Sequence, residues 1–498
     1  MTPGQHHVTA PEDRIPLGQK TAYAIGMLVN NLQAAALPAM VVILNLGLRM
    51  NPLLVGLIAA IPRAFDAITD PIVGYISDNS RTRWGRRRPY ILFGAISSAI
   101  VFGLMWQLPE GRSESFYFWT FLSASMLFFL FYTFYATPFV AFGYEMTADY
   151  HERTRLHTFA NTVGQLVWLG VPWFYAIMAN QNLFRDTVHG ARTLAVVVAV
   201  AVAVLGVVPA IACRERQVPL PPAGANRGIV ANMLEFLRGI GVTFKCKPFV
   251  KICAATFLVF NGYQLGISFS LYVMIYYLFG GSDSQGGELQ GWFGTLTAAA
   301  TLVVIPVTGW LATHIGKRKT FMFTISLSLV GYALKWFGYN PAHPYWLLLA
   351  APLAAFGVGS LFTLMGSMIA DVCDYDELGT GQRREGVFGA IYWWMVKIGM
   401  ALAGLLTGIM LTVSGFAVET KVQPESTLFL LRLFDVGVPL VTSALAIVVM
   451  FTYEISEDRA YEIRTELERR RGKLGLDPPT TPHTGEPVDA GRWNGEPT

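Results

Sequence analysis

Long apolar segments alternate with short polar connections along almost the whole chain. The runs FYFWTFLSASMLFFLFYTFYATPFVAF and LAVVVAVAVAVLGVVPAIAC contain no charged residue, and each is long enough to cross a bilayer as an α-helix. The pattern therefore predicts an all-α membrane protein with twelve transmembrane helices. Their approximate ranges are 18–48, 52–77, 89–108, 115–146, 156–181, 190–212, 248–279, 288–313, 320–339, 344–371, 385–416 and 427–454.

Composition agrees with this pattern. The 498 residues are 53% hydrophobic and only 14% charged, and the mean hydropathy is +0.43, whereas a soluble domain is about 25% charged. The net charge of +4 is too small to indicate a nucleic-acid partner. The N-terminal residues lack the basic region and short apolar core of a cleaved signal. We expect the lipid bilayer to be the main partner of the surface.

The connection between the sixth and seventh segments is polar and rich in Pro and Gly, which indicates a linker between two pseudo-symmetric six-helix bundles. The end of the chain, DPPTTPHTGEPVDAGRWNGEPT, has the composition of a disordered tail. The predicted units are a cytoplasmic N-terminal segment 1–17, a first bundle 18–213, a linker 214–247, a second bundle 248–455 and a cytoplasmic tail 456–498.

Basic residues favour one side of the membrane. The even-numbered connections carry 18 Lys and Arg residues and the odd-numbered connections carry five. Because Lys and Arg concentrate in cytoplasmic loops, both termini are predicted to face the cytoplasm. We expect a multi-pass protein of the inner (plasma) membrane.

The two halves repeat weakly. GYISD followed by GRRRP (Gly74 to Pro89) has its counterpart in GWLATHIGKRK (Gly309 to Lys319), and GYEMTADYHERTR (Gly143 to Arg155) has its counterpart in residues Ile369 to Gly386. A duplicated six-helix unit is typical of secondary transporters, in which two bundles move around a central site.

These motifs resemble a known family. The stretches DAITDP (Asp66 to Pro71), Pro138 to Arg153 and Asp371 to Gly386, together with Lys397, are similar to the glycoside–pentoside–hexuronide:cation symporters of the major facilitator superfamily, of which the melibiose carrier is the best known. The resemblance implies the major facilitator fold and cation-coupled sugar transport. It leaves the substrate open, because the wider group includes lipid carriers.

Three charged residues lie deep in the second predicted helix. Arg63, Asp66 and Asp70 are three and four residues apart and so share one helix face. Asp66 is ~14 residues into the helix, or ~21 Å from its start. A charge at that depth costs at least ~2.5–3.5 kcal/mol and usually marks an ion or substrate path. The alternative is a static clamp between Arg63 and the acids, but one arginine does not neutralise two carboxylates. The resemblance implies that Asp66 and Asp70 bind the coupling cation.

The chain departs from the melibiose-carrier pattern in ways that bear on the cation. An acid expected on the fourth helix is Ala136, and an acid on the first helix is replaced by an amide, Asn30 or Asn31. Na⁺ needs several oxygen ligands, for which Thr137, Asn30 and Asn31 are the candidates, whereas H⁺ needs one carboxylate. The sequence favours H⁺ and leaves Na⁺ possible; no other cofactor and no metal centre are expected.

Lys397 lies ~12 residues, or ~18 Å, into the eleventh helix, level with Asp66. An aspartate of the opposite bundle is its natural partner, and such a pair, with Arg63, could couple cation binding to docking of the halves. The alternative is a lysine that reaches the surface. That second interpretation is preferred for Lys335, near the outer end of the ninth helix.

Polar and aromatic stripes indicate the substrate site, because sugars bind through aromatic faces and hydrogen bonds. For any single aromatic residue, lipid contact or packing is the competing interpretation, whereas amides are costly against lipid. The candidates are Asp66, Tyr135, Phe139, Asn161, Gln165, Trp168, Asn261, Gln264, Tyr392, Trp393 and Lys397.

Charged residues at the cytoplasmic helix ends resemble the inner gate of the superfamily. The resemblance implies ion pairs between the bundles in the outward-open state. Each exposed pair is worth only ~0–1 kcal/mol, but a network could bias an equilibrium between two states. The candidates are Asp78, Arg86, Arg87, Glu145, Asp149, Arg153, Asp371, Asp374 and Arg384.

Together these features predict a monomeric, cation-coupled importer of a small sugar or glycoside that works by alternating access. The motif G-x-x-x-x-G-K-[ST] of ATP-binding loops is absent, and no nucleophile arrangement indicates an enzyme. Two rivals remain: a lysolipid or amphipath carrier on the same fold, and a transport-dead membrane sensor.

Overall fold

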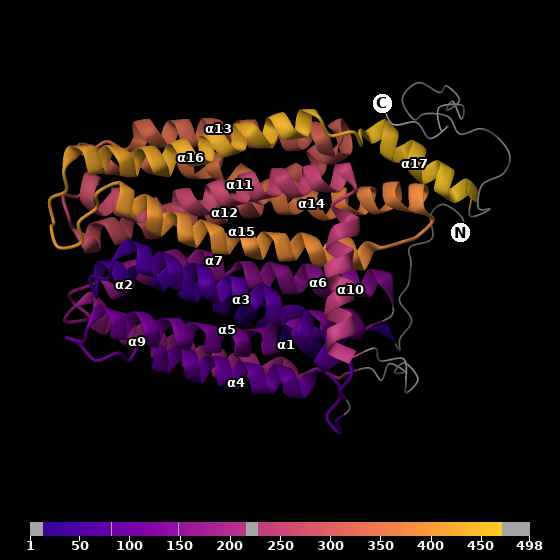
Figure 1. Cartoon of the computed structure of the whole chain (residues 1–498), viewed down its shortest axis with the longest axis horizontal. Coiled ribbons are helices and arrows are strands. Elements are labelled where there is room, and N and C mark those ends of the chain that lie inside the picture. The colour runs from indigo at the N-terminus through magenta and orange to yellow at the C-terminus, as the bar shows by residue number, and fades with distance from the viewer. Residues whose placement is uncertain (1–12, 81, 148, 216–227, 471–498) are drawn as a thin grey trace.

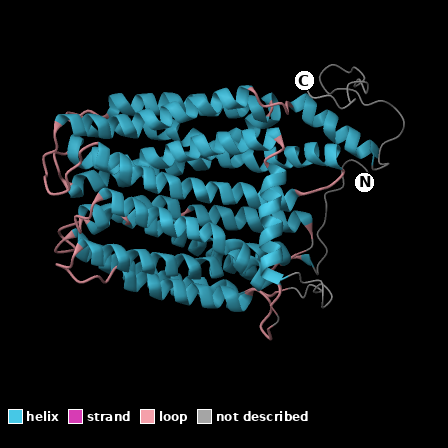
Figure 2. Cartoon of the chain, viewed as in Figure 1, coloured by secondary structure: helices cyan, strands magenta, loops and turns pink. Residues whose placement is uncertain are grey.

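The computed structural model describes residues 13–80, 82–147, 149–215 and 228–470. Over these residues the chain is helical and contains no strand, as the apolar pattern predicted (Figure 2). The start of the N-terminal segment, the first part of the predicted linker (216–227) and the predicted disordered tail after residue 470 lie outside the described residues.

The first half consists of the helices up to α9. Its elements are α1 (Leu17–Met40), α2 (Val42–Leu46), α3 (Pro52–Asp78), α4 (Arg88–Met105), α5 (Glu114–Glu145), α6 (Tyr150–Gln165), α7 (Val167–Gly170), the 3₁₀ turn η2 (Val171–Trp173), α8 (Phe174–Met178) and α9 (Thr187–Ala212).

The second half begins at α11. Its elements are α11 (Lys247–Tyr272), the π-helical turn η3 (Val273–Leu278), α12 (Asp283–Ile315), α13 (Lys317–Gly338), the 3₁₀ turn η4 (Pro344–Ala350), α14 (Ala351–Thr380), α15 (Glu385–Val413) and α16 (Glu425–Phe451). The long helices run side by side, while α10 (Gly228–Thr243) crosses them at the end where the described chain starts and finishes, here called the end with the termini. Helix α17 (Glu457–Arg470) lies beyond it (Figure 1).

Eleven of the described helices are long and apolar enough to cross a membrane. The fifth predicted segment, 156–181, is the exception, because it is divided into α6, α7, η2 and α8. Pro172 lies at one division, where its missing N–H and fixed φ angle interrupt regular α-helical hydrogen bonding. The prediction of twelve spans holds in position, but the prediction of one continuous fifth helix was wrong.

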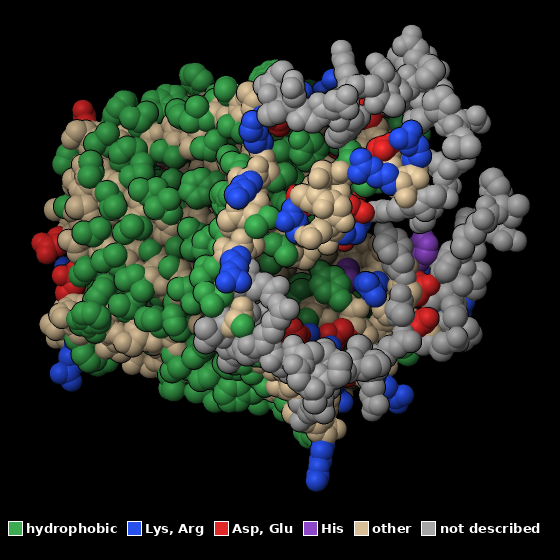
Figure 3. Space-filling model, turned by 45° about the vertical axis from the view of Figure 1, so that its right-hand side comes forward, with side chains coloured by type: hydrophobic (Ala, Val, Ile, Leu, Met, Phe, Trp, Pro, Cys, Tyr) green, Lys and Arg blue, Asp and Glu red, His purple; other side chains and the backbone are tan. Residues whose placement is uncertain are grey.

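The outer surface of the bundle is apolar. Large apolar side chains remain exposed after the helices pack, among them Phe93, Ile100 and Leu104 on α4 and Val204 on α9. Figure 3 shows hydrophobic side chains over the flank of the helices and charged side chains gathered towards the end with the termini. This distribution is that of a multi-pass membrane protein.

The two halves meet closely at the end opposite the termini, here called the loop end. A Cβ atom on Gly408 of α15 would lie 2.9 Å from the Gly56 Cα of α3, so glycine permits this approach. The Tyr272 hydroxyl hydrogen-bonds the Asn45 side chain at 2.9 Å, and the Trp173 indole donates to Thr295 Oγ1 at 2.8 Å. The structure is therefore closed between the halves at the loop end.

Candidate functional site

An ion cluster joins the two halves at the middle of the bundle. Helix α3, which packs along α15 of the other half, carries Asp66 and Asp70, and α15 carries Lys397. The Lys397 Nζ lies 2.8 Å from Asp66 Oδ2 and also forms an ion pair and a hydrogen bond with Asp70. One ammonium group of the second half thus binds two carboxylates of the first half.

Arg63 completes the charge balance of this cluster. Its guanidinium donates to the Ala34 carbonyl at 3.0 Å, lies 4.5 Å from the centre of the Phe129 ring, and approaches Asp66 only to 3.8 Å. Two acids therefore face two bases. The static clamp by Arg63 alone does not describe the site, because Lys397 makes the closer contact with Asp66.

Threonine hydroxyls of α5 bind the two carboxylates from the other side. Thr137 donates to Asp70 Oδ1 at 3.3 Å, and Thr133 donates to Asp66 Oδ1 at 2.7 Å. Sequence reasoning named Thr137 but missed Thr133. Its spacing of one helical turn from Thr137, matching the spacing of the two acids, was the signal that could have found it.

One of the two amides expected at the cation site has its hydrogen-bond partner elsewhere. The Asn31 side chain donates to the Gly164 carbonyl of α6 at 2.9 Å and so joins α1 to α6. The Asn30 Oδ1 is buried and has no hydrogen-bond partner in the described part of the chain. We therefore leave Asn31 out of the proposed cation site and keep Asn30 as a candidate. Helical periodicity placed them on α1 but could not tell which neighbour they face.

Exposure of the cluster increases towards the end with the termini. The Asp66 side chain is 0% exposed and Asp70, one turn further along α3, is 31% exposed. Across the interface, Lys397 is 23% exposed and Trp393, one turn nearer the same end, is 56% exposed. Side-chain exposure therefore rises from the ion cluster towards this same end on both α3 and α15.

Aromatic candidates separate into two groups. Trp393 stacks on Phe362 of α14, with ring centres 5.9 Å apart and planes 4° apart, and both rings remain exposed. Sequence reasoning missed Phe362. Tyr392, by contrast, is buried, and its hydroxyl lies 3.3 Å from Thr256 Oγ1.

Two further aromatic candidates belong to the packed core of the first half. The Tyr135 hydroxyl donates to the Gly26 carbonyl at 2.9 Å, and Phe139 stacks on the Tyr23 ring with centres 4.6 Å apart. Both candidates are fully buried. Core packing accounts for them, as it does for Tyr392, so we leave these three out of the proposed sugar site.

The amide candidates differ in exposure. Asn161 and Trp168 are exposed on α6 and α7, and Gln165 is half-buried between them. On α11, Gln264 is half-buried and Asn261 is buried against α15, where a Cβ on Gly399 would lie 2.5 Å from its Nδ2.

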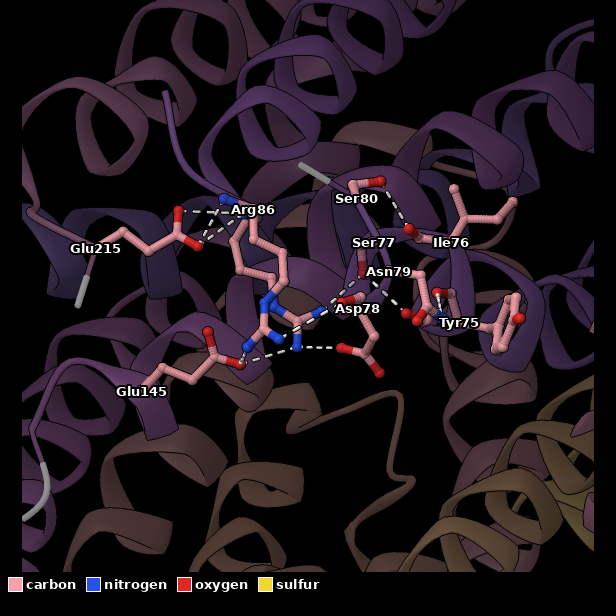
Figure 4. Close-up of polar contacts among 11 residues, drawn as sticks. Tyr75, Ile76, Ser77, Asp78, Asn79, Ser80, Arg86, Glu145 and Glu215 are labelled. Carbon is pink, nitrogen blue, oxygen red and sulfur yellow. Dashed lines mark hydrogen bonds and ion pairs between the residues drawn. The ribbon is translucent and has the colours of Figure 1, made fainter. Parts of the chain in front are cut away.

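Gate candidates of the first half form one network near the termini. The Glu145 Oε1 lies 2.6 Å from Arg86 and 2.9 Å from Arg87, and Arg87 also pairs with Asp78. Glu215 accepts hydrogen bonds from the backbone N–H groups of both arginines. Figure 4 shows Glu145 and Asp78 directed towards the guanidinium nitrogens.

The remaining gate candidates also have partners in their own half. Asp149 caps α6 by accepting from the Glu152 amide, and Arg153 donates to the Thr147 carbonyl. In the second half the pairs are Asp371 with Lys317 at 2.7 Å, Asp374 with Arg383 at 3.3 Å and Arg384 with Asp376 at 2.6 Å. These contacts lie within one half each, and the expected pairs between the bundles stay a prediction.

The prediction that Lys335 reaches the surface was wrong. It is buried, 2.6 Å from Asp435 Oδ1 and 2.6 Å from the Ser270 hydroxyl, and Tyr339 donates to the other oxygen of Asp435. The pair joins α11, α13 and α16 inside the second half. Because Asp435 lies about 100 residues away in the sequence, spacing along the chain could not reveal this partner.

Comparison with known proteins agrees with this architecture. Residues 22–457 match the family model described as MFS/sugar transport protein. The isoprimeverose transporter of Lactiplantibacillus pentosus is 24% identical, with 81% of each chain covered. The glucuronide carrier protein homolog of Escherichia coli K12 is 24% identical, with 84% of this chain and 87% of the relative covered.

Solved structures share the fold at low sequence identity. A bacterial homologue of the human lysosomal transporter Spinster, in an inward-facing and occupied conformation, has a TM-score of 0.61 at 14% identity, over 87% of this chain and 96% of the other. A D-xylose–proton symporter has a TM-score of 0.58 at 13% identity, over 88% and 98%. With the family match over most of its length, the chain belongs to the MFS/sugar transport family of the major facilitator superfamily, as the resemblance to the glycoside–pentoside–hexuronide:cation symporters predicted.

Proposed function

We propose that this protein is a cation-coupled symporter that carries a sugar or glycoside by alternating access, with H⁺ as the coupling cation. The observation that carries the proposal is the contact of Lys397, from the second half, with Asp66 and Asp70 of the first half. Because the Lys397 ammonium belongs to the second half and binds two carboxylates of the first half, a change in the protonation of Asp66 or Asp70 changes how strongly the halves are held together.

The coupling follows from competition for the same oxygens. A proton on Asp70 removes its charge and leaves Lys397 with Asp66 as its charged partner. The electrostatic attraction between the halves then weakens, because a neutral carboxyl group binds an ammonium less strongly than a carboxylate does. Asp70 suits this role better than Asp66, because it is the more exposed of the two towards the open side.

The donor set favours H⁺ over Na⁺. Na⁺ would need the space between the carboxylates that the Lys397 ammonium occupies, with the hydroxyls of Thr133 and Thr137 as additional ligands. A proton requires one carboxylate oxygen and no rearrangement of the other ligands.

The stacked pair of Trp393 and Phe362 supports the sugar assignment. It is an exposed aromatic platform, and its Trp393 lies one helical turn from Lys397 on α15. A sugar ring on this platform could hydrogen-bond Asp70 and Lys397, with Asn161, Gln165, Trp168 and Gln264 as further candidates. The names of relatives, among them a glucuronide carrier homolog and a putative sulfoquinovose importer of Escherichia coli, support a sugar as the substrate class.

We further propose that the end with the termini faces the cytoplasm of a bacterial-type inner membrane and that the protein acts as a monomer. On this orientation the structure is an inward-open state. In the outward-open state the gate residues would exchange some pairs within each half for pairs between the halves.

The test is a transport assay with purified protein in vesicles that enclose a pH-sensitive dye. Glycosides, pentoses and uronides are added with and without Na⁺ to the wild type, to Asp70→Asn, and to Glu110→Gln as a control acid at the loop end, paired there with Arg192. We expect sugar-dependent acidification without Na⁺ in the wild type and the control, and its loss in Asp70→Asn.

Other outcomes separate the alternatives. Sugar uptake that needs Na⁺ and moves no protons would replace H⁺ by Na⁺ and keep the symport mechanism. Uptake of lysolipid without any sugar signal would favour the amphipath carrier, and binding without uptake would favour the sensor.

A further inference from the structure

A groove on the membrane-facing side of α4 is separate from the transport site. It has a volume of about 570 Å³ and is lined by the turn after α3 and the first three turns of α4: Thr82, Arg83, Trp84, Pro89, Leu92, Phe93, Ile96 and Ser97. Neither the ion cluster nor the aromatic platform contributes to it.

The polar end of the groove is a well-defined turn. The Gly85 amide donates to the Thr82 carbonyl at 3.2 Å, and the Thr82 hydroxyl donates back to the Gly85 carbonyl at 2.6 Å. Gly85 has a φ angle of 106°, in the region where L-residues are strained. Glu215 stabilises the turn, because its carboxylate accepts a hydrogen bond from the Arg86 backbone N–H.

This turn places a cation and an indole at the mouth of the groove. Arg83 and Trp84 are both exposed, and Arg83 forms no ion pair with any residue in the described ranges. The neighbouring Arg86 differs, because it pairs with Glu145 inside the protein. An exposed arginine beside an exposed tryptophan at the end of a membrane helix is the arrangement that meets lipid headgroups.

Below the mouth the groove is apolar and lies in the membrane. From Pro89 to Ser97 it follows α4 for ~12 Å at ~1.5 Å per residue, most of the ~15 Å depth of one leaflet. Phe93 and Ile96 line it, and the exposed Ile100 continues the same face. A groove at this depth within one leaflet is exposed to acyl chains.

We propose that this groove binds one anionic phospholipid, with its phosphate at Arg83, its glycerol region against Trp84 and one acyl chain along Phe93 and Ile96. Arg83 supplies the charge that selects an anionic headgroup, and the groove supplies the apolar contact. The proposal is independent of the transported substrate.

Native mass spectrometry of the detergent-purified full chain tests the site. The protein is titrated with phosphatidylglycerol and, in parallel arms, with phosphatidylethanolamine and inorganic phosphate. For Arg83→Gln combined with Trp84→Ala, we expect the first phosphatidylglycerol adduct to bind at least about fivefold more weakly, the equivalent of ~1 kcal/mol for one basic residue. Phosphatidylethanolamine should be affected less, and phosphate alone should not bind at this site.

Two further variants make the result decisive. Ile96→Trp fills the groove without changing the charge and should weaken the same adduct, so the test remains valid if the double variant fails to fold. Arg112→Gln combined with Trp119→Ala removes an exposed arginine and an exposed tryptophan at the loop end and should leave the adduct unchanged.

Unchanged phosphatidylglycerol binding in both groove variants would overturn the proposal. Equal loss in the loop-end control would also overturn it, because the adduct would then report general surface binding. Equal loss of phosphatidylethanolamine would overturn the selection of an anionic headgroup.

Discussion

Removal of the Lys397 ammonium tests the ion cluster directly. In the wild type, Arg63 and Lys397 balance Asp66 and Asp70. Lys397→Gln leaves a net charge of −1 in the cluster, with the two carboxylates one helical turn apart. Adding Asp70→Asn restores neutrality, because Asp66 keeps Arg63 and the Thr133 hydroxyl.

The expected magnitude follows from the geometry. At 2.8 Å, with an effective dielectric constant of about 20, one ion pair contributes ~6 kcal/mol of Coulomb attraction before desolvation is subtracted. Breaking a buried pair by removing one partner typically costs ~3–5 kcal/mol. Because Lys397 and Asp70 are partly exposed, we expect Lys397→Gln to cost ~3 kcal/mol, and the double variant to recover most of this loss.

The assay is unfolding by sodium dodecyl sulfate in mixed micelles, followed by tryptophan fluorescence. Free energies of unfolding are compared for the wild type, the two single variants and the double variant, so that the coupling energy between Lys397 and Asp70 is measured. Lys319→Gln, at an exposed lysine near the termini, is the control and should behave as the wild type. Transport should stay absent in the double variant, because neutrality returns without the inter-half ion pair.

Two results would refute this reasoning. If Lys397→Gln were as stable as the wild type, the ammonium would not bind the carboxylates in the membrane protein. If the double variant were no more stable than Lys397→Gln, the penalty would come from lost packing and not from uncompensated charge.

Three other variants test the surrounding structure. Burial raises the pKa of Glu152, but the hydrogen bonds from Lys20 and other donors outweigh burial, so the net effect is a lowered pKa. The ionised Glu152 therefore stabilises the folded protein above the unfolded pKa of ~4.3, and this stabilisation is lost as the pH falls through the lower folded pKa. Glu152→Gln should accordingly unfold more easily than the wild type at pH 7, with a difference that shrinks as the pH falls below the unfolded pKa of Glu152. A difference that stayed constant with pH would contradict this. Gly408→Leu should open the loop end, because overpacking costs ~1–3 kcal/mol. Ser268 lines the small space between the halves, so a thiol introduced by Ser268→Cys reports this opening. Its reaction with a thiol reagent should become about tenfold faster for each 1.4 kcal/mol by which the closed packing is destabilised. Lys335→Met should lower the free energy of unfolding by ~3–5 kcal/mol because it leaves a buried aspartate unpaired, whereas a lysine that reached the surface would show almost no effect.

Much of the fold could be predicted from the local pattern. The length of the apolar runs predicted the positions of the membrane helices, because crossing the hydrocarbon core requires about 20 apolar residues whatever the neighbours are. The broken fifth segment was missed, since apolar composition says little about backbone geometry. Pro172 and Gly170 were signals for the interruption.

Part of the site was also predictable. The spacing of Asp66 and Asp70 placed both acids on one face, and the depth of Lys397 placed it level with them, because rise per residue and residues per turn are properties of any α-helix. The same periodicity could not show that Thr133 joins the site while Asn31 binds α6.

The sequence by itself determined that this chain crosses a membrane many times, that it repeats in two halves and that charged side chains lie at mid-depth. Only the tertiary structure decided which of these side chains meet. It brought Lys397 to both aspartates of the other half, paired Lys335 with Asp435, and placed Tyr135 and Phe139 in the core while Trp393 and Phe362 stayed exposed. The physical reason is that a helix presents its faces according to local geometry, whereas the partner of each face depends on how helices distant in sequence rotate and pack.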